Sequence, residues 1–127
     1  MIKIKHLFDA VENDDGARLW IEAIGLTIDL RQWCKVDHLL CHIGPPHHLA
    51  EWFEQHPDGY AYFRACYHEA LSRGRYRKAL QDLACAGQRQ NFTLLHQGDD
   101  PAHNTATALY EFLSELASYC PPDPPET

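Results

Sequence analysis

The chain has 127 residues, 45% of them hydrophobic and 23% charged, which is the balance of one globular domain with a core and excludes a wholly disordered or fibrous chain. The net charge of −7 argues against binding to phosphate backbones, so we expect no nucleic-acid partner. No apolar run approaches a membrane span and the N-terminus lacks the features of a secretory signal, so we expect no membrane partner and a cytoplasmic location.

The first half of the chain changes its apolar period once. Residues 2–8 alternate Ile and Lys, which predicts a strand, and residues 18–24 predict a second one. Residues 12–16 (ENDDG) are typical of a turn between them. Over residues 31–43 the apolar side chains recur at helical spacing, and the Gly-Pro-Pro of residues 44–46 ends this predicted helix.

The second half is dominated by helical patterns. Helices are predicted over residues 47–55, 60–71 and 76–83, and a buried strand over residues 91–96. Asp100 before Pro101 is typical of an N-cap, so the last helix is expected to begin there and to run to Leu116. This order predicts a single α/β domain over residues 1–119, with a small, mainly parallel sheet flanked by helices. The Pro-rich end, residues 120–127, is expected to be disordered.

The five cysteines are odd in number and form no CxxC pair. In the cytoplasm they are expected to stay reduced, without a disulfide framework or a zinc ribbon. Within the predicted helix 31–43, one broad face carries Cys34, His38, Cys41 and His42. Such a set suits zinc or another transition metal, with His47 and His48 nearby in sequence to complete a site. The favoured interpretation is a solvated helix face, so we expect no cofactor and keep metal binding as the alternative.

Three blocks of sequence carry residues in a specific order. Residues 8–23 contain Asp9, Asp15, Gly16 and Arg18; residues 36–57 contain Asp37, Pro45, Leu49, Trp52 and Phe53; residues 92–113 contain His103, Asn104, Ala106 and Leu109. This order resembles the DUF488 (YeaO-like) family, which is bacterial and archaeal and has no assigned function. The resemblance covers residues 1–116 and implies the fold of that family.

The chain also departs from the family pattern. Where the family has Asp-Arg-Leu-Trp-Pro-Arg-Gly, residues 22–28 read Glu-Ala-Ile-Gly-Leu-Thr-Ile, so Ala23 and Thr27 replace both arginines. His96 stands where the family has tyrosine. The resemblance therefore implies a divergent member in which any family site has partly decayed.

Two groups of polar residues are candidates for a ligand site. In open α/β sheets, ligands bind beyond the carboxyl ends of the strands. The candidate ligand-binding residues at such an edge are Asp9, Arg18, Glu22, His96, His103 and Asn104. Structural roles are the alternatives: Asp100 would cap the last helix, and Arg18 would pair with a carboxylate that holds the Asp15-Gly16 turn.

These residues do not define one function. Our first interpretation is a cytoplasmic protein that binds a small-molecule ligand in a partly decayed family site. An enzyme acting on a small polar substrate is the first alternative, with His103 as general acid/base and Asp9 or Glu22 as its partner. The others are metal binding and a homodimeric interaction module built on residues 33–43 and 49–53. The basic cluster at residues 73–78 is interpreted as a solvated helix junction.

Overall fold

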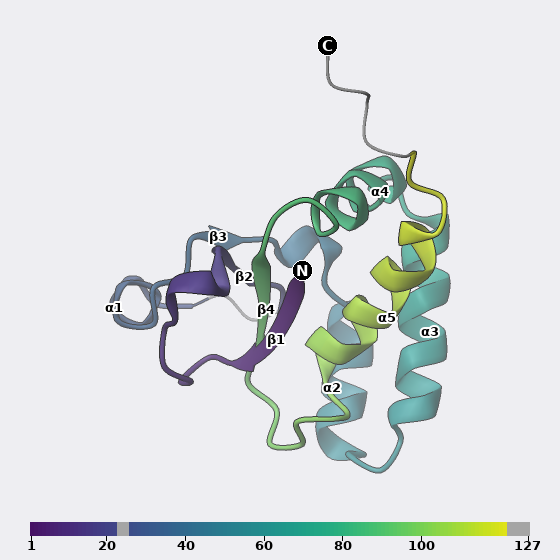
Figure 1. Cartoon of the computed structure of the whole chain (residues 1–127). Helices are drawn as coiled ribbons and strands as arrows, with labels where there is room; N and C mark the ends of the chain where they lie inside the picture. Colours follow the sequence, from purple (N-terminus) through teal and green to yellow (C-terminus); the bar gives the residue numbers. More distant parts are fainter. Residues whose placement is uncertain (23–25, 122–127) are drawn as a thin grey trace.

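One parallel sheet organises the chain, in a computed structural model that describes residues 1–22 and 26–121 (Figure 1). Its strands are β1 (Ile2–His6), β2 (Ala17–Trp20), β3 (His38–Leu39) and β4 (Phe92–His96). Their order across the sheet is β1-β4-β2-β3, and each neighbouring pair is parallel. The prediction of an α/β fold with a small parallel sheet is confirmed. The boundaries differ, since β1 ends at His6 and β2 at Trp20, and residues 23–24 of the second predicted strand lie outside the described residues.

Helices cover both faces of this sheet. They are α1 (Ile28–Trp33), α2 (His47–Gln55), α3 (Tyr60–Arg73), α4 (Arg77–Ala86) and α5 (Thr105–Ala117), with 3₁₀ turns η1 (Asn13–Asp15) and η2 (Cys41–Ile43). Figure 1 shows α2, α3, α4 and α5 gathered on one side of the strands, and α1 on the other. No helix within the described residues is long and apolar enough to cross a membrane.

Alternate residues of the central strands bury themselves in two separate cores. Leu19 and Leu94 belong to the larger core beneath α2–α5, whereas Trp20 and Leu95 belong to the smaller core on the α1 side. Successive side chains of a strand point to opposite faces, so neighbouring residues separate in this way. This two-sided burial explains why all five residues of β4 are buried.

The turn between β1 and β2 forms where the ENDDG segment predicts it. Gly16 has a φ of 63°, in the left-handed region that glycine adopts without strain. A side chain at this position would also collide with the backbone, because its Cβ would lie 1.9 Å from the carbonyl oxygen of Asn91. The turn thereby sets β2 directly beside β4.

The helix predicted over residues 31–43 is wrong. The chain leaves α1 after Trp33 and turns at Lys35, which has a φ of 55°. The Asp37 carboxylate then accepts a hydrogen bond of 2.7 Å from the Arg18 N–H, and the Leu40 N–H donates to the carbonyl of Trp20 at 2.7 Å. These long-range bonds to β2 make the segment an edge strand, and Trp33, expected in the core, is 81% exposed.

The last helix begins later than predicted. Its N-cap is Asn104, whose side chain accepts from the Thr107 N–H at 2.9 Å. Asp100 instead accepts from the backbone N–H groups of Ala102 and His103, at 2.8 and 3.3 Å. Asp100 therefore closes the turn that precedes the helix, because a short polar side chain can bond the backbone two residues on.

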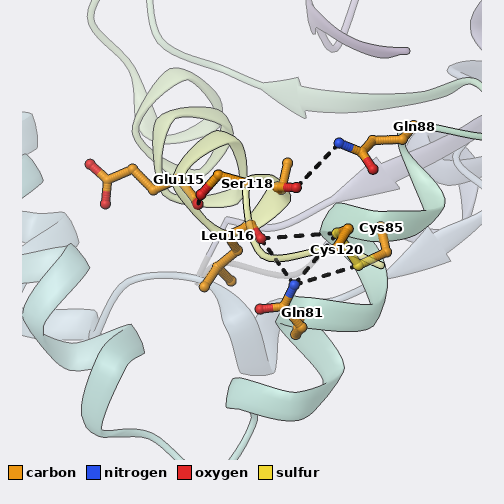
Figure 2. The surroundings of a disulfide bond; sticks show 8 residues. Gln81, Cys85, Gln88, Glu115, Leu116, Ser118 and Cys120 are labelled. Atoms are coloured by element: carbon orange, nitrogen blue, oxygen red, sulfur yellow. Dashed lines mark hydrogen bonds between the residues drawn. A yellow bond between two sulfur atoms is a disulfide. The ribbon is translucent and has the colours of Figure 1, made fainter. Parts of the chain in front are cut away.

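The cysteine prediction also needs correction, because Cys85 and Cys120 form a disulfide (Figure 2). Cys85 lies in α4 and Cys120 follows α5; these helices pack together and bring the two Cα atoms to 5.5 Å. Cys34, Cys41 and Cys66 are free. The Pro-rich end predicted over residues 120–127 lies outside the described residues from residue 122 onward.

Candidate functional site

A cavity of about 640 Å³ lies beyond the carboxyl ends of β2 and β4. Its wall comes from three parts of the chain: the end of β2 with Glu22, one face of α2, and the loop that joins β4 to α5. In Figure 1 this loop, drawn in light green, runs beside one end of α2. The lining residues are Trp20, Glu22, His47, Ala50, Glu51, Phe53, Glu54, Pro57, Gln97, Gly98, Asp99, Asp100, His103, Asn104 and Thr105.

The topology explains why a hollow forms between these two strands. β2 and β4 are neighbours in the sheet, but the chain leaves β2 toward α1 on one face and leaves β4 toward α5 on the other. Connections that diverge from adjacent parallel strands open a crevice at their carboxyl ends, which is the usual ligand position in open α/β sheets. The cavity therefore occupies the position at which the sequence analysis placed a site.

Asn104 fixes the loop that forms one wall. Its side chain is buried; the amide donates to the carbonyl of Asp100 at 2.9 Å, while the amide oxygen caps α5. One side chain thus links the turn that begins at Asp100 to the first turn of α5. Asn104 lines the cavity through a structural role, and its amide is already engaged on both sides.

His103 is paired with a carboxylate, but not with either of the predicted partners. Its Nδ1 lies 3.0 Å from Oδ2 of Asp100, and its ring lies against the Tyr60 ring with centroids 4.8 Å apart. The Ala102 backbone N–H and then the His103 ring hold the pKa of the Asp100 carboxyl below its usual value. The pair is half exposed at the rim of the cavity, so it is accessible to solvent.

Glu22 is the half-buried acid of the site. Burial raises the pKa of its carboxyl, and the nearby Glu54 charge raises it further. The Thr105 hydroxyl, at 3.3 Å, and the Gln97 backbone N–H donate to Glu22 and offset only part of this rise. Glu22 can therefore accept hydrogen bonds as a carboxylate, or hold a proton at a higher pH than an exposed glutamate does.

The wall as a whole is acidic and partly aromatic. Its carboxylates are Glu22, Glu51, Glu54, Asp99 and Asp100. The aromatic side chains are Trp20 and Phe53, and neither Lys nor Arg lines the cavity within the described residues. An acidic, low-dielectric hollow concentrates a negative potential, which favours cations over anions.

The structure separates the six predicted ligand-binding residues. Glu22, His103 and Asn104 line the cavity, whereas Asp9, Arg18 and His96 do not. Asp9 is exposed and accepts a hydrogen bond of 2.9 Å from the backbone N–H of His6. The predicted partnership of His103 with Asp9 has no contact in the structure, because His103 bonds Asp100 instead.

Arg18 takes the structural role that was its alternative interpretation. Its guanidinium is buried; Nη1 donates to Oδ2 of Asp15 at 2.8 Å, and Nε and Nη2 donate to the carbonyl of Cys34 at 3.1 and 3.0 Å. These bonds join the η1 turn to the end of α1. The guanidinium is thereby occupied away from the cavity.

His96 lies behind the cavity wall. It is 4% exposed, and its ring meets the His6 ring edge-on with centroids 5.5 Å apart. A carbon added at the lining residue Gly98 would lie 3.9 Å from Nδ1 of His96, so this ring lies close to the cavity wall. Burial and then the neighbouring His6 lower the pKa of His96, which favours the neutral ring.

The predicted metal set does not assemble, since the helix that would carry it does not exist. Cys34 is buried at the end of α1, His38 is exposed on β3, and the His42 ring packs against Tyr76 at 4.7 Å. No three His, Cys, Asp or Glu side chains of the described chain gather as ligands for a metal ion.

The wall contributed by α2 is absent from the site predicted from the sequence. His47, Ala50, Glu51 and Glu54 all line the cavity, and their spacing places them on one face of the helix. That face is visible in the sequence. What it covers depends on how α2 packs beside the β4–α5 loop, which no local pattern encodes.

The sequence comparisons support the resemblance found in the three blocks. A family model described as "Inactive DUF488-N3 subclade" matches residues 1–120. No curated protein and no solved structure matches the chain. Because the match spans almost the whole chain, the protein belongs to the DUF488-N3i family, the inactive DUF488-N3 subclade.

Proposed function

We propose that the protein binds a small polar molecule in the cavity between β2, α2 and the β4–α5 loop, without transforming it. The observation that carries this proposal is the cavity itself, of about 640 Å³, at the carboxyl ends of adjacent parallel strands. Small-molecule sites have volumes of about 300–1,000 Å³ and occur at this position in α/β folds. Such a binding protein needs a shaped hollow and hydrogen-bonding groups, and the described wall has both.

Three observations favour binding without catalysis. Ala23 and Thr27 replace the arginines of the related DUF488 pattern, and Thr27 now caps α1 through a hydrogen bond from the Leu30 N–H. Arg18 is buried in a structural ion pair. The description of the matching family as inactive agrees with this loss of candidate catalytic groups.

A cavity-filling variant tests the proposal. Ala50 lines the cavity from the exposed side of α2, so we expect Ala50→Trp to fill the hollow without disturbing either core. The matched control is Ala70→Trp, which places the same ring in a separate groove of about 520 Å³ between α2 and α3. Binding is followed by ¹H–¹⁵N spectra during addition of a mixed set of small amines, alcohols and carboxylates.

The expected result is a set of shifts confined to the amides of the cavity wall, with Gly98 and Thr105 among them. These shifts should disappear in Ala50→Trp and persist in Ala70→Trp. Absence of cavity shifts with every compound, or shifts that survive in a folded Ala50→Trp variant, would contradict the proposal.

The Asp100–His103 pair favours one second candidate, a hydrolase that acts on a small polar substrate. A histidine oriented by a carboxylate is a suitable general base, and this pair lies at the rim of the cavity. Hydrolysis of p-nitrophenyl acetate tests it. Turnover lost in His103→Gln but kept in His47→Gln would support catalysis by the pair, whereas equal background rates in both variants would exclude it.

A further inference from the structure

We infer that the ligand of this cavity is an organic cation, an ammonium or guanidinium group joined to a short apolar group, with Glu22 as its anchor. This inference rests on the proposed function and adds the chemical class of the ligand. It depends on the charge of the wall, on the partners that each charged group already has, and on the aromatic lining.

The cavity wall has more carboxylates than basic side chains to pair with them. His47 Nε2 lies 2.9 Å from Glu51 and His103 Nδ1 lies 3.0 Å from Asp100, so both lining histidines are already beside a carboxylate. Glu22, Glu54 and Asp99 form no ion pair with any basic side chain of the described chain. An entering cation would therefore meet three carboxylates that lack a positive partner.

Glu22 is the deepest of these acceptors. A carboxylate can accept about four hydrogen bonds, and Glu22 has the Thr105 hydroxyl and the Gln97 N–H as donors. Its burial and the neighbouring Glu54 charge both disfavour the ionised form. An ammonium or guanidinium donor would relieve this cost while filling the acceptor sites that remain.

Acidic groups alone would not define a site, and the second observation is the lining between them. Phe53 gives the hollow an aromatic surface and is held by stacking on Phe63, with ring centroids 4.3 Å apart, whereas Trp20 borders the hollow but is 1% exposed and packs in the smaller core. Aromatic faces bind both alkyl groups and cations. A cavity of about 640 Å³ with such walls is larger than a bare ion needs.

The structure also disfavours a metal ion as the occupant. A divalent cation needs several ligand atoms within about 2.0–2.6 Å of one point. No three acidic, His or Cys side chains of the described residues converge in this way. Dispersed carboxylates around a hollow that Phe53 lines fit a larger organic cation, which can contact them separately.

Three probes of matched size test the class: 3-phenylpropylamine, 3-phenylpropan-1-ol and 3-phenylpropanoate, each titrated into the full chain at pH 7 and followed by ¹H–¹⁵N spectra. We expect the amine to bind in the cavity about tenfold or more tightly than the alcohol, because its hydrogen bonds and ion pairs are charge-assisted. The carboxylate is expected to be the weakest. Glu22→Gln should cost the amine about tenfold and leave the alcohol unchanged.

Two further variants separate the local effect from the general charge. Glu54→Gln removes a second carboxylate of the wall and should weaken the amine as well. Glu69→Gln removes one charge from the α2–α3 groove and should not. Its carboxylate pairs with Arg73 at 2.9 Å on an exposed surface.

The outcomes distinguish this inference from the proposed function. Alcohol or carboxylate binding in the cavity as tight as the amine would overturn the cationic class but keep a small-molecule site. Amine binding unaffected by both Glu22→Gln and Glu54→Gln would also overturn it. No cavity binding by these probes or by the mixed set would instead contradict the proposed function.

Discussion

Among the charged residues, Asp15 has several cationic partners at once, and these contacts bear on the stability of the fold. It is 1% exposed and accepts hydrogen bonds from Lys3, Lys5 and Arg18, all at 2.8–3.1 Å. Burial alone raises the pKa of the Asp15 carboxyl, but the Glu12 backbone N–H and these three cations outweigh it, so the pKa lies well below its usual value. The sequence predicts the turn and an Arg18–carboxylate pair, but not the two lysines.

We predict that Asp15→Asn destabilises the fold by about 3–5 kcal/mol, because it leaves the Arg18 guanidinium buried without its carboxylate. Urea unfolding at pH 7 measures the change. The control is Asp14→Asn, which removes a surface contact to Lys3 and should cost less than about 1 kcal/mol. Equal effects of the two substitutions would contradict a special role for the buried pair.

The same residue predicts a dependence on acid. Since the folded pKa of Asp15 is lower than the unfolded one, its contribution is present above the unfolded value of about 3.9 and is lost as the pH falls through the folded value. The difference in unfolding free energy between the natural chain and Asp15→Asn should therefore shrink below about pH 4. A difference that stays constant down to pH 2 would exclude this linkage.

The pH dependence of stability expected for Glu22 is opposite in sign to that of Asp15. Its folded pKa is raised, chiefly by burial, so ionisation opposes folding and the cost grows as the pH rises through the folded pKa. We predict that Glu22→Gln raises the melting temperature at pH 7 and has a smaller effect at pH 4. Thermal unfolding checks this, with Glu69→Gln as the exposed control. A lower melting temperature at pH 7 would show that ionised Glu22 stabilises the fold.

At the scale of elements, the local apolar pattern predicts most helices and strands, whereas long-range contacts decide the structure of one segment. The helices α2, α3 and α4 and the strand β4 form close to the predicted ranges, and α5 ends close to its predicted end, because each has a clear apolar period and a Gly or Pro near its ends. The segment 34–43 does not. Its apolar spacing fits a helix, but Val36 and Ile43 enter separate cores and Asp37 bonds the backbone of β2. A tertiary contact therefore overrides a local preference.

The disulfide joins α4 to the segment that follows α5, a pairing that the sequence does not predict. Figure 2 shows the Gln81 amide beside both sulfur atoms; it donates to the carbonyl of Leu116 at 3.0 Å and so links α4 to the end of α5. We predict that Cys120→Ser destabilises the folded chain by about 3–4 kcal/mol, the range for a loop of this length. Cys66→Ser, which removes a free thiol, is the control. Denaturant unfolding without reductant measures both.

Alkylation verifies the bond itself. In denaturant without reductant, three cysteines should react, namely Cys34, Cys41 and Cys66, and reduction should expose the remaining two. Five reactive thiols before reduction would contradict the bond and restore the expectation that every cysteine is reduced.

At the scale of the whole molecule, the sequence predicts the sheet and the edge at which the cavity lies, but only part of the cavity wall. The three family-like blocks and the alternation of strands and helices lead to the correct fold class. The cavity depends on the divergence of the connections that follow β2 and β4 and on the packing of α2, and these are properties of the assembled chain. Glu22 and His103 both line the cavity, whereas Asp9 and Arg18, which the sequence predicts at the same site, form their contacts elsewhere in the fold.

The net charge of −7 makes a final prediction for the whole chain. Its main basic cluster, at residues 73–78, is partly neutralised, because Arg73 pairs with Glu69 at 2.9 Å and Lys78 with Asp82 at 3.6 Å. Affinity for a phosphate backbone depends on a surplus of cations and falls as salt rises. We therefore expect no binding to a fluorescent 20-base-pair duplex in polarisation measurements at low salt. The double variant Glu69→Gln, Asp82→Asn removes the partners of Arg73 and Lys78. We expect weak, salt-sensitive binding to appear in this variant before it appears in the natural chain. Salt-sensitive binding by the natural chain would show that local cations outweigh the net charge.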